Sequence, residues 1–217
     1  MNRRDFSIHL AGGGLGLALA GSALAQGGPV EGKDYVKLSQ PLPSGAPAGK
    51  VDMIEFFWYG CPHCNVFEPA LDAWSRKLPA DVAFRRVPVA FTAIHETHAR
   101  IFYALETIGK VDAMHRKVFA AIHVQNQRLD KEADIVAFMV ANGIDGAKFT
   151  EAFKSFSTQT KVKQGKSLSE AYKIDGVPAL GVHGRFYTSG SLAGTNEKAL
   201  AVADFLIQRS RSATCAD

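Results

Sequence analysis

Cysteine is scarce in this chain: Cys61, Cys64 and Cys215 are the only three among 217 residues. A small secreted protein that depends on disulfides for stability carries a larger, even set of cysteines. A chain of this length can bury a sufficient hydrophobic core without such cross-links. The sequence therefore excludes a disulfide-stapled scaffold, and the close spacing of Cys61 and Cys64 needs a chemical explanation.

Runs of basic residues are also absent. The net charge is +4 at pH 7, and it falls to +3 without residues 1–25, because that segment holds two basic residues and one acidic one. A nucleic-acid-binding surface needs a concentrated basic patch. The sequence therefore argues against nucleic acid as a partner.

A long uninterrupted apolar segment is the third absence. The N-terminus instead has the three parts of an export signal: basic residues in Arg3-Arg4-Asp5-Phe6, a glycine-broken apolar stretch from Leu10 to Leu24, and the small-residue site Ala23-Leu24-Ala25. A permanent membrane helix needs about 20 strongly apolar residues, which disfavours an anchor. We predict a signal peptide over residues 1–25 that is cleaved after Ala25. The paired arginines also resemble a twin-arginine signal, so the Sec and twin-arginine routes both stay open.

A strand, a helix and a second strand follow one another in the first half of the chain. Val51–Tyr59 is a run of apolar and aromatic residues, which predicts a buried strand. A helical pattern begins near Cys61 and continues to about Lys77, before Pro79. Val82–Val89 predicts the second strand. This order indicates a βαβ unit.

Residues 93–165 have helical rather than strand character. Four apolar stripes at helical spacing predict four helices, and a further helix is expected over Lys163–Tyr172. The stripes consist of Ile101, Ala104, Leu105 and Ile108; of Met114, Val118 and Ile122; of Ile135, Phe138 and Met139; and of Phe149, Phe153 and Phe156.

Strand character returns near the C-terminus. Val177–Val182 and Arg185–Thr188 flank a turn at His183-Gly184, which predicts a β-hairpin. A last helix is expected from about Gly194 to Arg209. The whole order predicts an α/β protein with a thioredoxin-like fold interrupted by a helical insertion. The expected divisions are the signal peptide, a split thioredoxin-like domain over 33–92 and 166–211, the insertion over 93–165, and a flexible tail over 212–217.

The Cys61-Pro62-His63-Cys64 motif carries the chemistry. Disulfide exchange needs a thiolate, and a helix N-terminus directs unpaired N–H groups and a positive dipole at Cys61. Pro62 is tolerated in a first helical turn, and His63 adds a nearby donor or cation. Stabilising the thiolate favours the reduced form, so such a protein gives its disulfide away and acts as an oxidant.

A zinc site and a purely structural disulfide are the alternatives to redox chemistry at this pair. Zinc would need two more ligands at suitable spacing, but Cys215 is distant, and His95 and His98 are expected to be solvated. A purely structural disulfide does not need the strand-Cys-helix context. We therefore predict a redox-active Cys61–Cys64 disulfide, with no metal and no other cofactor.

The segment Phe56-Phe57-Trp58-Tyr59-Gly60-Cys61-Pro62-His63-Cys64 resembles the active site of the DsbA family of periplasmic thiol:disulfide oxidoreductases, and Gly176-Val177-Pro178-Ala179-Leu180 resembles the family's cis-proline loop. The likeness spans nearly the whole chain after the signal. The resemblance implies that Cys61 is the nucleophile, Cys64 its buried partner and His63 a residue that tunes the pair. It also implies a cis Pro178, with Val177 offering backbone groups to an extended substrate.

Glu55 interrupts an apolar strand, where an unpaired charge is costly to bury. The resemblance makes it a buried acid that moves protons near Cys64. The alternative is a carboxylate at a strand end that reaches solvent. Trp58 and Tyr59 similarly fit either a substrate surface or core packing.

The function implied by the resemblance is donation of the Cys61–Cys64 disulfide to reduced, newly exported proteins in the periplasm. A membrane quinone-linked oxidase resembling DsbB would regenerate the disulfide, and we expect a monomer. The alternatives are a disulfide reductase or isomerase, and a thioredoxin-like factor that binds clients without turnover. Cys215 is most simply a free thiol of the tail.

Overall fold

The computed structural model describes residues 27–214, so the predicted signal peptide, its cleavage site and Cys215 lie outside the described residues. Five strands form one mixed sheet in the order β1-β5-β4-β2-β3. Strand β2 is parallel to β3 and antiparallel to β4, and β5 is antiparallel to both β4 and β1. The strands are β1 (Val36–Lys37), β2 (Val51–Phe57), β3 (Val82–Pro88), β4 (Ala179–Val182) and β5 (Phe186–Ser189).

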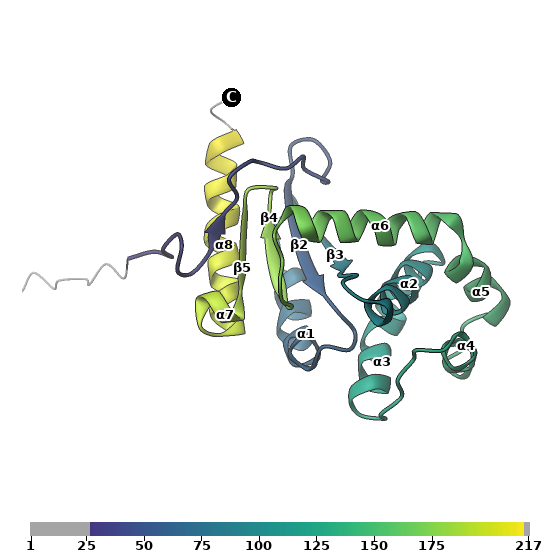
Figure 1. Cartoon of the computed structure of the whole chain (residues 1–217). Coiled ribbons are helices and arrows are strands. Elements are labelled where there is room, and N and C mark those ends of the chain that lie inside the picture. The colour runs from purple at the N-terminus through teal and green to yellow at the C-terminus, as the bar shows by residue number, and fades with distance from the viewer. Residues whose placement is uncertain (1–26, 215–217) are drawn as a thin grey trace, which may run out of the picture.

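The helices divide into two groups. In Figure 1 the helices α2 to α6 lie together on one side of the molecule, and the sheet lies with α7 and α8 on the other. Strand β3 precedes the first group in the chain and β4 follows it. The helices are α1 (Pro62–Ser75), α2 (Ala93–Thr107), α3 (Val111–His123), α4 (Glu132–Ala141), α5 (Gly146–Lys154), α6 (Phe156–Ala171), α7 (Gly190–Ala193) and α8 (Asn196–Thr214).

Strand β2 is buried along its whole length, as expected of a central strand with apolar neighbours on both faces. It ends at Phe57, two residues before the predicted end at Tyr59. The Cys61 N–H donates to the Trp58 carbonyl at 3.0 Å, which closes a turn immediately after the strand. This turn delivers the chain into α1.

Helix α1 begins one residue after Cys61, and Pro62 occupies its first turn. Its buried face includes Cys64, Phe67 and Leu71, at three- and four-residue spacings. The helix ends at Ser75 rather than at Lys77. It therefore presents Cys64 to the core and leaves Cys61 at its N-terminal end.

The helical segment has its own apolar core, and this core continues into the cysteine site. One cluster of buried residues contains Ile101 of α2, Val118 of α3 and Phe149 of α5 together with Cys61 and Cys64. Sheet and helical segment are thus packed together at the cysteine pair.

Two predictions about the end of the helical segment are wrong. Phe156 was expected in an inward stripe with Phe149 and Phe153, but it is 82% exposed. Ser155 explains this, because its hydroxyl accepts from the Thr158 N–H at 3.1 Å and starts a new helix there. The helix expected over Lys163–Tyr172 therefore begins at Phe156. Because α6 is continuous through residue 165, the division expected between 165 and 166 falls inside a helix.

The predicted hairpin is present as β4 and β5. Its two turn residues, His183 and Gly184, both have positive φ, 51° and 65°, which is the conformation that a two-residue turn of this kind requires. The four-residue helix α7 after it was not predicted.

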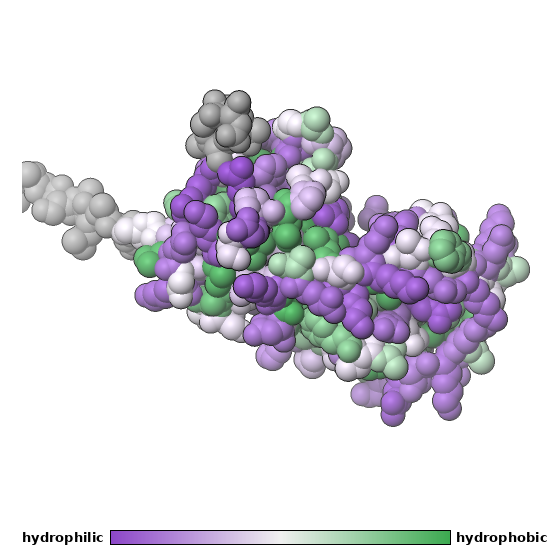
Figure 2. Space-filling model, turned by 45° about the horizontal axis from the view of Figure 1, so that its top comes forward, coloured by the Kyte–Doolittle hydropathy of each residue, from purple (hydrophilic) through white to green (hydrophobic). Residues whose placement is uncertain are grey.

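The last helix extends further than predicted. It continues past Arg209 to Thr214, and Arg211 makes two hydrogen bonds to Asp81, at 2.6 and 2.7 Å, that tie its end to the loop before β3. None of the helices within residues 27–214 is long and apolar enough to cross a membrane. On the face shown in Figure 2, polar residues cover most of the helical segment and apolar ones lie between them.

Candidate active site

Cys61 is the N-cap of α1. Its backbone is extended, with φ −83° and ψ 117°, and its sulfur accepts a hydrogen bond from the Cys64 N–H at 3.4 Å. The turn before it depends on Gly60, because a Cβ at that position would lie 2.3 Å from the Trp58 ring. A glycine is therefore required where the Trp58 ring packs against the approach to the cysteine.

The Cys61 sulfur lies in an environment that favours the thiolate. Its hydrogen bond with the Cys64 side chain lowers the pKa of Cys61 most; the backbone N–H groups of Cys64 and His63 and the charge of His63 act in the same direction. Burial opposes them, and the pKa falls from 9.0 to about 6. This is the effect expected at a helix N-terminus.

Cys64 has the opposite environment. It is 0% exposed, and burial raises the pKa of its thiol far above the ordinary range, with the Cys61 sulfur and the Glu55 carboxylate acting in the same direction. Both cysteines are free thiols in this structure. The pair therefore consists of one acidic, approachable sulfur and one buried sulfur that keeps its proton.

The loop before β4 faces the pair. The Val177–Pro178 peptide bond is cis, as the family resemblance implied, and the Cys61 thiol donates to the Val177 carbonyl at 3.3 Å. A hollow of about 580 Å³ beside this loop is lined by His63, Val177, Pro178 and Tyr187, and by the chain around α7. His63 and Pro62 are both exposed. The structure thus brings Pro62, His63, Val177 and Pro178 together around Cys61.

Glu55 is completely buried, so the alternative of a carboxylate that reaches solvent is wrong. One oxygen, Oε2, accepts from Arg86 Nε at 2.9 Å, and the other, Oε1, has no hydrogen-bond partner. Burial raises the pKa of Glu55 to about 8; Arg86 opposes this shift and Glu68 adds to it. A carboxyl in this position holds a proton near neutral pH.

Sequence reasoning missed the partners of Glu55. Arg86 on β3 also donates to Glu68 of α1 at 2.9 Å, and Glu68 lies 3.4 Å from His115 of α3. Glu68 could have been found from its place four residues after Cys64, on the same face of α1. Arg86 and His115 gave no such signal, because each has a basic neighbour in the sequence, Arg85 and Arg116, and nothing in the spacing distinguishes it from that neighbour.

Three further side chains near the motif have structural roles. Tyr59 is 0% exposed and packs on Phe57, which makes it a core residue. His98, expected to be solvated, is buried and pairs with the Arg128 carbonyl at 3.1 Å. His95 lies against the Trp58 ring, with the ring centroids 4.2 Å apart. Within residues 27–214 there is no group of three side chains suited to hold a metal ion.

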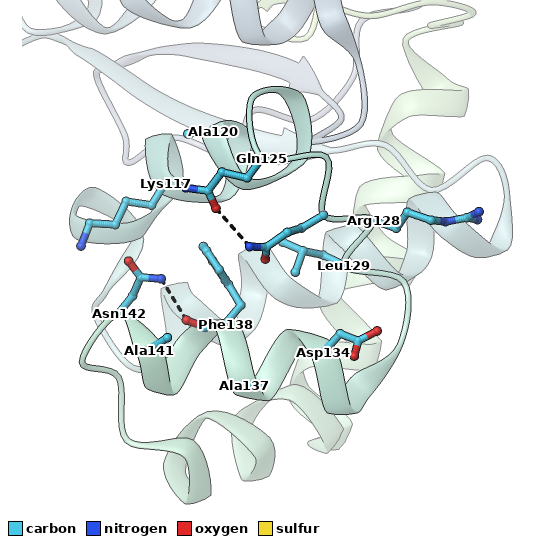
Figure 3. Close-up of a pocket in the computed structure, with 11 residues that line it drawn as sticks. Lys117, Ala120, Gln125, Arg128, Leu129, Asp134, Ala137, Phe138, Ala141 and Asn142 are labelled. Atoms are coloured by element: carbon cyan, nitrogen blue, oxygen red, sulfur yellow. Dashed lines mark hydrogen bonds between the residues drawn. The ribbon is translucent and has the colours of Figure 1, made fainter.

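A second hollow of the molecule is remote from this chemistry. It has a volume of about 700 Å³ and lies between α3, the following loop and α4. Figure 3 shows the Phe138 ring between these elements, with Lys117 and Asp134 at the margin. No cysteine or histidine lines it.

A sheet that presents a cysteine pair at a helix N-terminus beside a cis-proline loop defines a thiol:disulfide oxidoreductase with a thioredoxin-like fold. The sequence model of the family described as DSBA-like thioredoxin domain matches residues 83–198. The chain belongs to this DsbA family. Its redox-active group is therefore a pair of cysteines and not a bound cofactor.

Curated relatives agree with this membership over most of the chain. The thiol:disulfide interchange protein DsbA of Pseudomonas aeruginosa is 41% identical over 182 residues, which cover 84% of this chain and 86% of that protein. The protein of the same name from Azotobacter vinelandii is 40% identical and covers 92% of this chain and 97% of its own length.

Solved structures give the same result. The crystal structure of Pseudomonas aeruginosa DsbA superposes with a TM-score of 0.81 at 40% identity, over 84% of this chain and 95% of that one. Oxidoreductase DsbA from Xylella fastidiosa superposes with a TM-score of 0.79 at 28% identity, over 85% and 98%. The predicted fold class, a thioredoxin-like fold interrupted by a helical insertion, is confirmed.

Proposed function

We propose that this protein donates a Cys61–Cys64 disulfide to reduced, newly exported proteins. The observation that carries the proposal is the contrast between the two sulfurs, a Cys61 thiol with a pKa of about 6 and a fully buried Cys64. A stable Cys61 thiolate favours the reduced pair over the disulfide. The oxidised protein then gains free energy when it passes its disulfide to a client.

The exchange proceeds through two sulfur displacements. A client thiolate attacks Cys61 Sγ, a bond forms between these two sulfurs, and the bond from Cys61 to Cys64 breaks. Cys64 leaves with the electron pair and takes a proton, as its high pKa favours. A second client thiolate then attacks the client sulfur and releases Cys61 as a thiolate. The client is oxidised by two electrons and the protein is reduced by two.

Glu55 is proposed as the group that exchanges this proton with Cys64. Its raised pKa of about 8 lets it hold or release a proton near neutral pH. Its unpartnered Oε1 is free to take part. His63 is proposed to tune Cys61 through its charge and N–H group, and Pro62 to preset the first turn of α1.

Val177 and Pro178 are proposed to dock the client. An unfolded client offers extended backbone, and the Val177 carbonyl already lies 3.3 Å from the attacked sulfur. The hollow beside the loop has room for client side chains next to the mixed disulfide. The same surface would meet the oxidase that regenerates the disulfide.

Partners and location follow from family membership. The relatives are named thiol:disulfide interchange proteins, and we propose that this chain acts in the periplasm on exported proteins. For this chain we propose reoxidation by a membrane quinone-linked oxidase of that kind, a monomeric state, and removal of residues 1–25 by cleavage after Ala25 on either export route. We also propose a split thioredoxin-like domain interrupted by a helical insertion that begins at residue 93; its second boundary lies at the end of α6 rather than between 165 and 166, and α8 continues to Thr214.

The test is oxidation of a reduced two-thiol client by the oxidised protein. Cys61→Ala and Cys64→Ala should each abolish it, because neither variant can form the disulfide, and the matched Cys215→Ala should leave it unchanged. Unchanged oxidation by Cys61→Ala would overturn the proposal. A titration of the Cys61 thiolate and the redox equilibrium with glutathione show in which direction electrons flow. An ordinary thiol pKa and a reducing potential would assign a reductase or isomerase. Client binding without turnover would assign a client-holding factor.

A further inference from the structure

A network of buried polar side chains extends from Glu55 into the helical segment. Glu55 and Glu68 share the guanidinium of Arg86, each at 2.9 Å. Glu68 Oε2 then faces His115 Nε2 at 3.4 Å, and His115 Nδ1 lies 2.9 Å from the Tyr59 hydroxyl. This network therefore connects strand β2, strand β3, helix α1 and helix α3.

The positions of the protons in this network follow from the burial of its groups. Burial raises the pKa of Tyr59 well above its ordinary value, so its hydroxyl keeps its proton and donates to His115 Nδ1. Burial also lowers the pKa of His115, so the ring is neutral near pH 7. The remaining proton then belongs on Nε2, which points at Glu68. Within residues 27–214 neither Glu68 Oε2 nor His115 Nε2 has a hydrogen-bond partner, so each is left with the 3.4 Å ion-pair contact between them.

The surroundings of His115 leave few other interactions for this ring. The rings of Phe57, Phe102 and Phe119 lie 5.1, 6.0 and 5.2 Å from it, centroid to centroid. The charged groups that act on it are Glu68 and Asp72 of α1 and Arg86 of β3. The side chain is 4% exposed. His115 is thus held between one hydroxyl and one carboxylate.

A second histidine of α3 also contacts Tyr59. His123 Nε2 lies 2.8 Å from the Tyr59 backbone carbonyl. Tyr59 is two residues before Cys61, so both histidines attach α3 to the turn that presents the nucleophile. His123 fixes the backbone of this turn, and His115 connects its side chain to the buried charges.

We propose that His115 is a positioning residue for disulfide exchange, which holds Glu68 so that Arg86 remains shared with Glu55 beside Cys64. Without the His115 donor, Glu68 would take both nitrogens of Arg86, and Glu55 would lose its only partner. Glu55 would then keep its proton to a higher pH. The inference rests on the proposed role of Glu55 in the proton exchange of Cys64.

The test follows the reduced protein as it reacts with oxidised glutathione. Cys61 first forms a mixed disulfide, and Cys64 must then lose its proton to displace glutathione and close the pair. The rate of this second step should rise with pH through the pKa of Glu55. In His115→Phe we expect the midpoint to move up by about 0.5–1 pH unit, since one polar contact within a buried charged network is lost.

Four further variants separate positioning from packing. His115→Gln keeps an uncharged donor toward Glu68 and should restore the wild-type midpoint. Tyr59→Phe removes one hydroxyl and should give a smaller upward shift. In a Glu68→Gln background, His115→Phe should add no shift, because its partner is gone. His98→Phe removes a buried histidine that does not belong to this network of polar groups and should leave the midpoint unchanged.

Each outcome decides the proposal. A His115→Phe profile that superposes on the wild type overturns it, and so does a His115→Gln shift as large as that of His115→Phe. If His115→Phe does not fold, an unshifted Tyr59→Phe profile overturns it. The glutathione reaction needs only a working cysteine pair. Failure of client oxidation in the wild type would therefore count against the proposed function, while the midpoint shifts would still report on His115.

Discussion

Strand β2 buries two carboxylates, Asp52 near its start and Glu55 closer to its end, and each pairs with an arginine of β3, but the two pairs differ in how fully they are satisfied. At the start, both oxygens of Asp52 are used: Arg85 donates to them at 2.9 and 3.0 Å, and the Gly45 N–H donates to one at 2.9 Å. At the end, Glu55 has a partner on one oxygen and shares Arg86 with Glu68.

This contrast separates a structural pair from a chemical one. A buried carboxylate with all its hydrogen bonds made stabilises the fold. A buried carboxylate that lacks a partner and meets a second carboxylate has its pKa raised instead, as Glu55 does. The end of β2 that leads to Cys61 is the one that keeps an incompletely satisfied acid.

The largest effect should come from the titration of Cys61. Its native pKa of about 6 lies below the ordinary 9.0, so between these values the unfolded state binds more protons than the native state. The stability of the reduced protein relative to the oxidised one should therefore rise from pH 6 to pH 9, by about 3 kcal/mol once solvent screening is allowed for, and be lost as the pH falls through 6. Urea unfolding of both redox forms across this range measures it. A difference independent of pH would contradict the depressed pKa.

Asp52→Asn should give the next largest effect, on stability alone. The amide places a donor where the Gly45 and Arg85 donors point, and it removes the negative partner of Arg85. Because the Arg85 side chain is 36% exposed, we expect a loss of about 2–3 kcal/mol rather than the full cost of breaking a buried pair. Urea unfolding measures the loss, and the rate of client oxidation at equal folded concentration should stay unchanged. A slowed oxidation would break the distinction between the two ends.

Glu55→Gln should have the opposite effects to Asp52→Asn: a slower exchange reaction with little change in stability. Removing the proton-exchanging group should slow the glutathione-releasing step about 10-fold. Stability near pH 7 should change little, because Glu55 mainly holds its proton at that pH and a neutral amide then replaces a neutral acid. Native Glu55 keeps its proton up to about pH 8, whereas an ordinary glutamate releases it near 4.5. Proton binding by native Glu55 therefore stabilises the wild type at low pH, and this stabilisation is lost as the pH rises from near 4.5 to 8. The variant should show a flatter dependence. Stopped-flow rates and unfolding at several pH values measure both effects.

Glu132→Gln should have the smallest effect. Glu132 and Lys154 are 2.6 Å apart, but their side chains are 44% and 56% exposed. Breaking such a pair should cost less than about 0.5 kcal/mol and leave the redox rates unaltered. Thermal unfolding measures it, and a cost as large as that of Asp52→Asn would mean that burial does not decide the value of these pairs.

Much of the fold is predictable from local patterns in the sequence. The run Val51–Phe57, Pro62 after Cys61 and the His183-Gly184 turn each specify a local conformation. The errors occur where one residue decides between two conformations. Ser155 starts α6 and turns Phe156 outward, and Arg211 holds the end of α8 by a contact with the distant Asp81.

The candidate site was predictable only along the chain. The motif and the resemblance named Cys61, His63, Cys64 and Pro178 as neighbours. The partners of Glu55 come from three other elements, and no spacing in the sequence relates Arg86 to His115. Their association depends on how α3 packs against the sheet, which is a property of the tertiary structure.

The unequal burial of the two sulfurs also affects how the protein is assayed. A reagent that alkylates accessible thiols can reach Cys61, which is 7% exposed and ionised near neutral pH, whereas Cys64 is completely enclosed. Within residues 27–214, the folded, reduced protein should therefore take up one label under native conditions and two after denaturation. In the Cys215→Ala variant, a single label on the native protein therefore marks reduced Cys61 and should not be taken as evidence of a half-oxidised sample.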